Sequence, residues 1–267
     1  MIIGKSFKSR RICIILGVFS ILVLITAYSF LSTMQHRKNI NDTTIPGLKQ
    51  LIEGYHKVVT PTARGDVWLY EDLSATLSRL FSGLFISILI SLCLAVGMGC
   101  FPTIEALLTP VVSILAKLTP TAMLAVFFVI FGTGTQMFVS MIVFGIVPSL
   151  TQSTYLAVKK IPREFIDKAY TLGGSTFEVI WFVIVKQIFP VFLNNIRLSI
   201  GPAMVYLIAA EMLVGDVGFG YRIRIQSRLL AMNVVYLYLA VLAAFGYLMD
   251  YSLSRINQKL FSWFNQE

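Results

Sequence analysis

The sequence predicts an all-α membrane protein with six transmembrane helices. Hydrophobic residues make up 57% of the 267 residues and charged residues only 13%, whereas soluble domains carry about 25% charged residues. Apolar runs recur along the chain, and about 20 apolar residues suffice to cross about 30 Å of hydrocarbon. The net charge of +9 comes mainly from Lys and Arg that flank these runs, which is typical of topology determinants rather than of a nucleic-acid-binding surface.

The first predicted span follows the basic stretch KSFKSRR and reads ICIILGVFSILVLITAYSFLSTM. A cleaved signal peptide is the alternative, because Ala27 and Ser29 offer a small-residue cleavage pattern. The apolar run exceeds the roughly 7 to 15 residues of a signal core, which favours an uncleaved helix. A polar external loop with one short surface helix follows and ends at LYEDL. Residues 1–72 are therefore expected to form an N-terminal helix plus an external loop.

Five further spans are expected to form a helical core at residues 73–257, followed by a tail at 258–267. Lys and Arg are enriched on cytoplasmic flanks. They cluster before the first span, in the segment 158–188 and in the tail, which predicts that both termini lie inside. The five spans are expected at residues 73–101, 118–131, 136–157, 191–212 and 233–253.

The segment 158–188 is a polar interruption in an apolar chain. Its first helix has an apolar face at i, i+4 and i+7, with charged residues opposite. Pro162 favours a helix start, Gly173 a helix stop, and Ser175 a cap for the next helix. From the pattern alone, a helix that docks on a partner and one that lies on the bilayer both remain open. The apolar face consists of Phe165, Ile166, Ala169, Tyr170 and Leu172.

The same segment resembles the cytoplasmic loop signature of ABC importer permeases, which contains Glu-Ala-Ala, a glycine, an isoleucine and Leu-Pro at fixed spacing. Here Gly173 follows Asp167-Lys168-Ala169 after three residues, and Val183 and Val185-Lys186 stand at the Ile and Leu-Pro positions. Asp replaces the Glu of the signature, and lysines replace its first Ala and its Pro.

The resemblance extends over roughly residues 70–260. The run LYEDLSATLSRLFSGLFISILISLCLAVGMG resembles the first core helix of the nitrate/sulfonate/taurine-type branch of these permeases. The runs AKLTPTAMLAVFFVIFGTG, IVPSL and NNIRLSIGPAMVYLIAAEMLVGDVGFGY resemble later parts of the same core. The chain thus resembles a type I ABC importer permease.

This resemblance implies a transport subunit of the bacterial inner membrane that imports a small anion, such as nitrate, a sulfonate, taurine or bicarbonate, by alternating access. The implied partners are a second copy in a homodimer, two ATP-binding cassette subunits that hold ATP and Mg, and an external substrate-binding protein. No cofactor and no enzymatic activity are expected on this chain, whose sequence has no Gly-x-x-x-x-Gly-Lys-Ser/Thr phosphate loop. The implied ATPase-coupling residues are Phe165, Asp167, Ala169, Tyr170, Leu172 and Gly173.

Two alternatives stay open. One is a permease of the same superfamily for another solute, such as a thiamine-precursor pyrimidine or an amino acid. The other is a membrane assembly subunit that transports nothing. The permease and the assembly subunit differ in one requirement: only a permease needs an ATPase subunit that binds residues 163–174. The solute itself is not specified, because selection in this family lies largely in the separate binding protein.

The charged residues singled out inside apolar spans are Arg79, Arg197 and Glu211. Such residues usually face a bundle interior or a water-filled path. They are expected either to line the translocation path or to pair with one another and lock helices together, and pairing is favoured. Which arginine pairs with Glu211 is left open.

The outer loop after GDVGFGY carries Arg222, Arg224 and Arg228, against the usual charge bias. These arginines are expected either to form an external gate or binding-protein contact, or to face solvent and lipid headgroups. Lys117 is expected to extend to the inner interface.

No metal site is indicated by the sequence. His36 and His56 stand alone in the first external loop, without ligand spacing. The cysteines are odd in number and lie in or beside apolar runs, so they predict neither a disulfide framework nor a metal site. The three are Cys13, Cys93 and Cys100.

Overall fold

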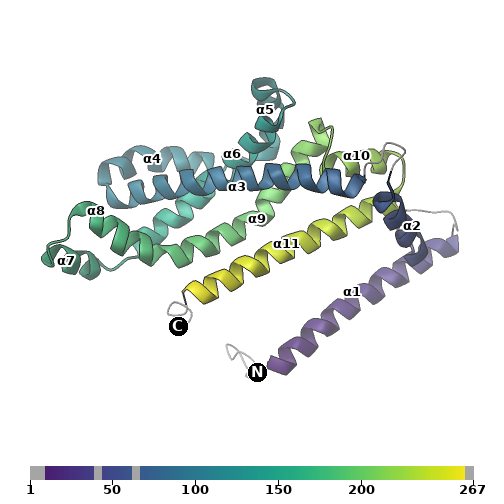
Figure 1. Cartoon of the computed structure of the whole chain (residues 1–267), viewed down its shortest axis with the longest axis horizontal. Coiled ribbons are helices and arrows are strands. Elements are labelled where there is room, and N and C mark those ends of the chain that lie inside the picture. Colours follow the sequence, from purple (N-terminus) through teal and green to yellow (C-terminus); the bar gives the residue numbers. More distant parts are fainter. Residues whose placement is uncertain (1–9, 39–43, 62–66, 262–267) are drawn as a thin grey trace.

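The computed structural model describes residues 10–38, 44–61 and 67–261, and every regular element in these ranges is a helix. The long helices run side by side along the molecule (Figure 1). In chain order the elements are α1 (Arg10–Lys38), α2 (Leu48–Val59), α3 (Trp68–Cys100), α4 (Pro102–Leu115), η1 (Pro120–Met123), α5 (Leu124–Phe131), α6 (Thr135–Lys159), α7 (Arg163–Thr171), α8 (Thr176–Glu178), η2 (Val179–Val185), α9 (Lys186–Val214), α10 (Phe219–Arg228) and α11 (Met232–Leu260).

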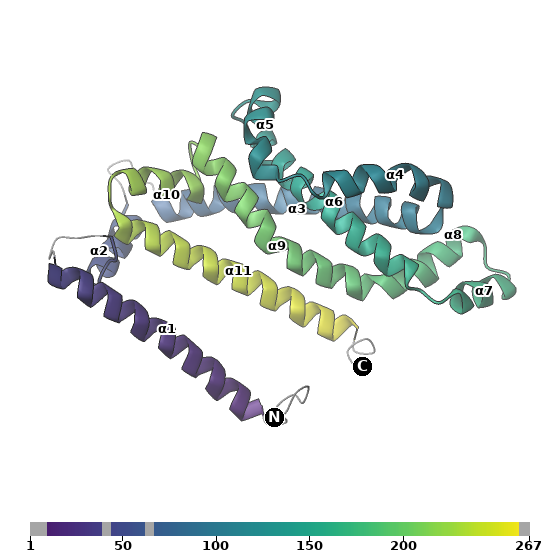
Figure 2. The ribbon, with the colours of Figure 1, turned by 180° about the vertical axis from the view of Figure 1, so that it is seen from behind.

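Five helices among the described residues are long and apolar enough to cross a membrane. A sixth crossing is complete if α4 and η1–α5 form one span that is bent by 80°. The prediction of an all-helical protein with six spans is therefore confirmed. Helix α7 lies at one end of the molecule, whereas α2 and α10 lie together at the other (Figures 1 and 2). These are called the inner and outer ends, following the predicted orientation.

The third predicted span, residues 118–131, was wrong as a crossing of its own, although residues 120–131 are helical. The segment α5 has 8 residues, which at 1.5 Å per residue is about 12 Å and too short to cross a bilayer. The inner half of the bent span is α4, which the prediction left outside the spans. The bend has a local cause, because Thr119 precedes Pro120 and is extended, and a proline disfavours helical backbone at the residue before it. Gly132, at φ +69°, ends α5.

Two predicted helix boundaries also shift. Helix α3 begins at Trp68 rather than at residue 73, so LYEDL is helical instead of a loop. The fifth span begins well before residue 191, because α8, η2 and α9 form one continuous helical span at Thr176–Val214 of 39 residues. The expected short surface helix in the external loop is present as α2.

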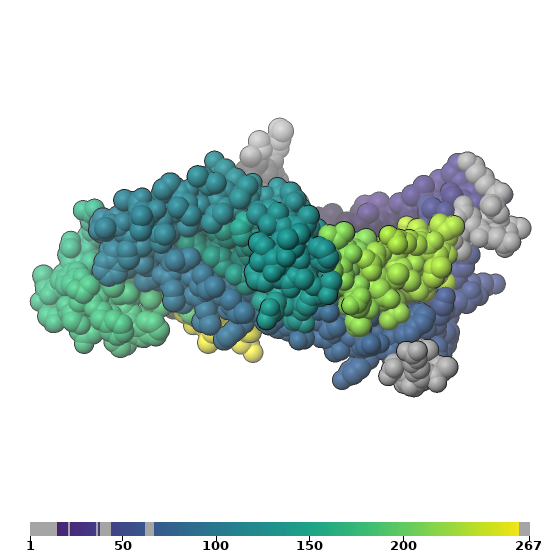
Figure 3. Space-filling view, turned by 90° about the horizontal axis from the view of Figure 1, so that it is seen from above, coloured from purple at the N-terminus to yellow at the C-terminus, as the bar shows by residue number. Residues whose placement is uncertain are grey.

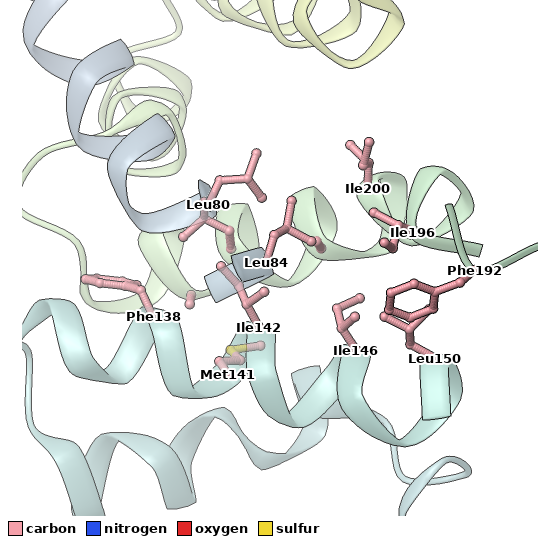
Figure 4. Close-up of a cluster of buried hydrophobic side chains, with 13 residues drawn as sticks. Leu80, Leu84, Phe138, Met141, Ile142, Ile146, Leu150, Phe192, Ile196 and Ile200 are labelled. Atoms are coloured by element: carbon pink, nitrogen blue, oxygen red, sulfur yellow. The ribbon is translucent and has the colours of Figure 1, made fainter. Parts of the chain in front are cut away.

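The core lies where α3, α6 and α9 pack together (Figure 4). Small residues let these helices approach closely, as is typical of membrane bundles. A Cβ atom on Gly83 would lie 2.8 Å from the Ile142 side chain, and one on Gly99 would lie 2.4 Å from Val158. The labelled core residues are Leu80, Leu84, Phe138, Met141, Ile142, Ile146, Leu150, Phe192, Ile196 and Ile200.

Helix α1 stands apart from this core (Figures 1 and 2). Only 6% of its most apolar stretch is buried, as suits a helix that is surrounded by lipid or by another subunit. It is tied to the external segment by the Tyr28 hydroxyl, which donates to the Pro46 carbonyl at 2.7 Å. The predicted inner-flank residues Lys5 and Lys8 lie outside the described residues. So do the side chains of Arg10, Arg11, Cys13 and His36.

Candidate functional site

Helix α7 is the element that the sequence analysis assigned to a partner. It lies at the inner end beyond α6 and packs against η2 (Figure 1). One side of the helix is anchored, because Ile166 packs on a cluster that includes Val158, Ile161 and Ile184. The anchoring gives this short helix a defined position relative to the spans.

The expected apolar face of α7 is divided between two environments. Ile166 and Ala169 are half-buried. Phe165 is 49% exposed, Tyr170 45% and Leu172 88%. Asp167 and Gly173 are also exposed. Phe165 and Leu172, the C-cap of α7, are seven residues apart, so they share one side of the helix and form an apolar edge that the described part of the chain leaves exposed.

The turn after α7 has the geometry that its sequence predicts. Gly173 adopts φ +88°, in the left-handed region that glycine tolerates best. Ser175 then caps α8, because its hydroxyl accepts from the Glu178 N–H at 3.4 Å while the Glu178 carboxylate accepts from the Ser175 N–H at 2.8 Å. The predicted cap at Ser175 is confirmed. This reciprocal cap fixes the path from α7 into the long span.

At the outer end, Glu211 is fully buried and lies at the centre of a polar cluster. Its carboxylate accepts from Arg79 Nη1 at 2.8 Å and from the Thr76 hydroxyl at 3.0 Å. It also accepts from the Gly220 N–H at 3.0 Å. Arg79 donates a second hydrogen bond to the Val217 carbonyl at 2.8 Å. Of the two interpretations given to Glu211, the structure shows the paired arrangement, with Arg79 as the partner.

A second buried carboxylate, Asp72, lies beside this cluster and was placed in a loop by the sequence analysis. It is fully buried on α3. Arg222 Nε donates to it at 2.8 Å, the Tyr238 hydroxyl at 2.7 Å and the Gly218 N–H at 3.0 Å. The side chains of α3, α10 and α11 therefore converge on one acid.

The two acids together hold the α9–α10 loop against α3. The Phe219 N–H donates to the Thr76 hydroxyl at 3.0 Å, and this bond adds a further link between the loop and α3. Gly218 adopts φ +125°, and a Cβ there would lie 2.6 Å from the Glu211 carboxylate. Only glycine therefore fits at this point of the loop.

The remaining predicted residues lie elsewhere. Arg197 forms an ion pair with Asp250 of α11, so the structure does not bring it to Glu211. Arg224 donates to the Leu213 and Gly215 carbonyls at 2.7 and 3.1 Å. Arg228 is exposed at the end of α10. Lys117 lies in the turn between α4 and η1, and His56 on α2 is exposed.

A family model described as "Binding-protein-dependent transport system inner membrane component" matches residues 83–262. The chain belongs to this family. It is therefore a transport subunit of the inner membrane and not an enzyme. The taurine transport system permease protein TauC of Escherichia coli (strain K12) is 28% identical over 255 residues, which cover 96% of this chain and 91% of TauC.

Two further comparisons agree with this membership. The nitrate import permease protein NrtB of Leptolyngbya laminosa is 24% identical, over 63% of this chain and 62% of NrtB. An inward-facing structure of the MetNI methionine ABC transporter superposes with a TM-score of 0.61 at 20% identity, covering 70% of this chain and 94% of that chain. The predicted nitrate/sulfonate/taurine-type branch and the type I importer fold are confirmed.

The sequence analysis missed Asp72, Tyr238 and Asp250. A signal for the first was present, because Asp72, Thr76 and Arg79 are spaced at i, i+4 and i+7 and so share one face of a helix. Reading the polar turn as a loop concealed this spacing. Tyr238 and Asp250 carry no such pattern, because their partners Asp72 and Arg197 are distant in sequence.

Proposed function

We propose that this permease imports a small anion as a homodimer, driven by two ATP-binding subunits that dock on α7 and supplied by an external binding protein. The observation that carries the coupling proposal is the exposed apolar edge of α7, Phe165 and Leu172, at the inner end. The solute class is supported by the relatives, since NrtB is named for nitrate, an oxyanion, and TauC for taurine, a zwitterion that carries an anionic sulfonate group.

The exposed edge fits a helix that inserts into a groove of a partner. Leu172 is 88% exposed, and burying a leucine side chain stabilises a complex by about 1.5–3 kcal/mol. Single exposed apolar residues are ordinary on protein surfaces. Here, however, three large apolar side chains are exposed close together on α7, a helix of 9 residues, and on the turn that follows it. They are Phe165, Tyr170 and Leu172.

The same helix is suited to transmit movement. It packs on η2, and η2 continues without a break into α9. ATP and Mg²⁺ are held by the partner in this proposal, so this chain contributes only the docking helix and the moving spans. A displacement of α7 on nucleotide-driven closure would therefore move a spanning helix as a rigid element.

The binding protein is assigned to the outer end. Helices α2 and α10 form that end, where Arg228 is exposed and Arg222 and Arg224 are engaged within the chain. Of the three outer arginines, Arg228 is thus the one available for an external contact.

The experiment is a pull-down of the tagged permease from mild detergent, with ATPase activity measured on the co-purified subunits. Leu172→Glu is expected to reduce recovery of the ATPase about tenfold or more, because truncating or charging an apolar anchor costs about 2 kcal/mol or more of binding. Thr171→Glu is the matched control. It adds the same charge one residue earlier, on a different side of α7, and should retain most of the ATPase.

Equal recovery with both variants would show that the α7 edge is not the docking surface. Failure of the unmodified chain to recover any ATPase would overturn the ATPase-coupling proposal. Uptake only of solutes without an anionic oxygen-bearing group would retain the importer and exclude the proposed solute class.

A further inference from the structure

A groove of about 320 Å³ lies between α6 and α9, well inside both spanning helices. Its walls combine apolar residues with neutral polar side chains, and no charged residue lines it. Pockets for small molecules start at roughly this size, so the groove is large enough for a small organic or inorganic anion. The polar residues are Ser149, Ser153, Asn195, Ser199 and Tyr206.

The polar lining distinguishes this face from the lipid-facing surfaces. On the inner half of α3 the exposed side chains are all apolar, namely Phe85, Ile86, Leu89, Ile90 and Cys93. Polar side chains on a membrane span usually face a protein interior or a water-filled path, because lipid cannot satisfy them. The groove therefore faces protein or water in the assembled transporter.

The positive charges inside the spans do not provide an anion site. Arg79 is neutralised by Glu211, and Arg197 by Asp250. Both arginines inside these spans are therefore already paired. An anion in the groove would contact neutral hydroxyl and amide groups instead.

We infer that the α6–α9 groove is the solute-contacting wall of the translocation path, where neutral hydroxyl and amide donors bind the oxygen atoms of a small oxyanion. This inference rests on the proposed importer function. It assigns residues to the path that the sequence analysis did not consider, and it removes Arg79, Arg197 and Glu211 from that role.

The hydrogen bonds of the groove suit transient binding. Ser149, Ser153 and Ser199 each donate to a carbonyl of their own helix, at 3.1, 3.0 and 2.9 Å. Such hydroxyls can rotate towards a solute and return when it leaves, so neither state has an unsatisfied donor. The Asn195 amide nitrogen is buried and has no hydrogen-bond partner among the described residues, so it is a donor left for a solute and does not tie the helices together.

Neutral donors also have a kinetic advantage for transport. A transport path must bind its solute strongly enough to admit it and weakly enough to release it. Hydrogen bonds to a charged group are stronger than those between neutral groups, and a desolvated arginine would add a second charge. A wall of single neutral donors therefore favours passage over retention.

The groove is open on one side, and we assign a second copy of the chain as its cover. Helix α5 projects from the bundle (Figure 1) and faces the viewer near the middle of Figure 3, and Val129 on it is 81% exposed. The base of this projection adjoins the groove, because a Cβ on Gly145 would lie 2.5 Å from the Tyr206 ring and 2.9 Å from Pro120. A two-fold dimer built on this face would close the path with the same groove of the partner.

The first test is uptake of radiolabelled taurine and nitrate into proteoliposomes that contain the complete transporter. Asn195→Asp is expected to reduce uptake about tenfold or more, because a like charge facing the anion is strongly unfavourable. Asn194→Asp is the matched control. It places the same charge on the next residue of α9, outside the groove lining, and should retain uptake to within about twofold. Equal losses in both variants would overturn the assignment.

The second test does not depend on the solute. Ser199→Cys in a background without native cysteines is expected to react with 2-sulfonatoethyl methanethiosulfonate, a membrane-impermeant reagent that carries a sulfonate. A chain that retains only Cys93, which is exposed on an apolar face of α3, should react at least about tenfold more slowly, because thiolates form and react in water. Equal rates would show that the groove is not a water-accessible path.

The two tests separate this inference from the proposed function. If the wild-type transporter takes up neither probe but Ser199→Cys reacts rapidly, taurine and nitrate are excluded as solutes and the path assignment stands. If uptake is normal and Ser199→Cys is unreactive, the importer stands and the groove is excluded.

Discussion

The two ends of the permease treat their charged side chains in opposite ways. At the outer end, carboxylates and arginines are buried and paired within one chain, as with Glu211 and Arg79. At the inner end, no residue of α7 is buried, and its charged side chains and the neighbouring Leu172 are exposed. The buried charges of the outer end are thus satisfied within the chain, whereas the charges of α7 lie in solvent.

This difference predicts separate consequences for mutations at the two ends. Changes at the outer end should lower the stability of the chain itself, because they leave buried polar groups without partners. Changes at the inner end should leave stability nearly intact and affect only the assembled transporter. Each prediction below tests one side of this contrast.

The largest effect is expected from Glu211→Gln. The change leaves Arg79 buried without a counter-charge, which costs about 3–5 kcal/mol of unfolding free energy. Titration of the detergent-solubilised chain with SDS measures the loss. The double variant Arg79→Met, Glu211→Met should regain part of it, because it removes both charges. A single variant as stable as the wild type would show that the buried pair contributes nothing to the outer end.

The next effect is expected from Gly218→Ala. A methyl group there meets the Glu211 carboxylate, and the φ of +125° is unfavourable for alanine, so a loss of about 2–3 kcal/mol is expected. The same SDS titration applies. Gly134→Ala is the control, since a Cβ there has nothing within 4 Å and its φ is −76°, and it should change stability little.

At the inner end, Gly173→Val is expected to reduce ATP-driven uptake strongly while the SDS titration changes little. Valine is strained at the φ of +88° by about 1–2 kcal/mol, so the end of α7 should refold and misplace Leu172. Gly173→Asn is the matched control, because asparagine tolerates the left-handed region. Equal loss of uptake in both variants would mean that the backbone conformation is not what matters.

The smallest effect is expected from Lys159→Ala. Lys159 pairs with Glu105 at 2.6 Å, but both side chains are partly exposed, and pairs of this kind contribute little to stability. The melting temperature should remain within experimental error of the wild type. A clear decrease would show that the inner end also depends on ion pairs within the chain.

Most of the fold was predictable from the sequence because hydropathy alone determines which segments can enter lipid. There are two exceptions. Around Pro120 the apolar pattern continues while the backbone turns, so the pattern could not distinguish one straight span from the bent pair of α4 and α5. The start of α3 was misplaced because Asp72 in its polar beginning is buried by tertiary contacts rather than by lipid.

The sites were predictable where local sequence determines structure. The cap at Ser175 and the turn at Gly173 depend on neighbouring residues alone. The partners of Glu211 and Asp72 depend on how α3, α9, α10 and α11 meet, which spacing within one helix does not specify. The α6–α9 groove was missed for another reason, since serine and asparagine are common residues and only their shared exposure identifies them.

The helical span at Thr176–Val214 is longer than the membrane requires. Its 39 residues correspond to about 58 Å of helix at 1.5 Å per residue, nearly twice the thickness of the hydrocarbon region. The π-helical segment η2 and the prolines at 190 and 202 lie within it, and such features bend a helix. One uninterrupted helix thus joins the turn after α7 to the buried Glu211, and under the proposed coupling a movement of α7 would reach the outer end through covalent structure alone.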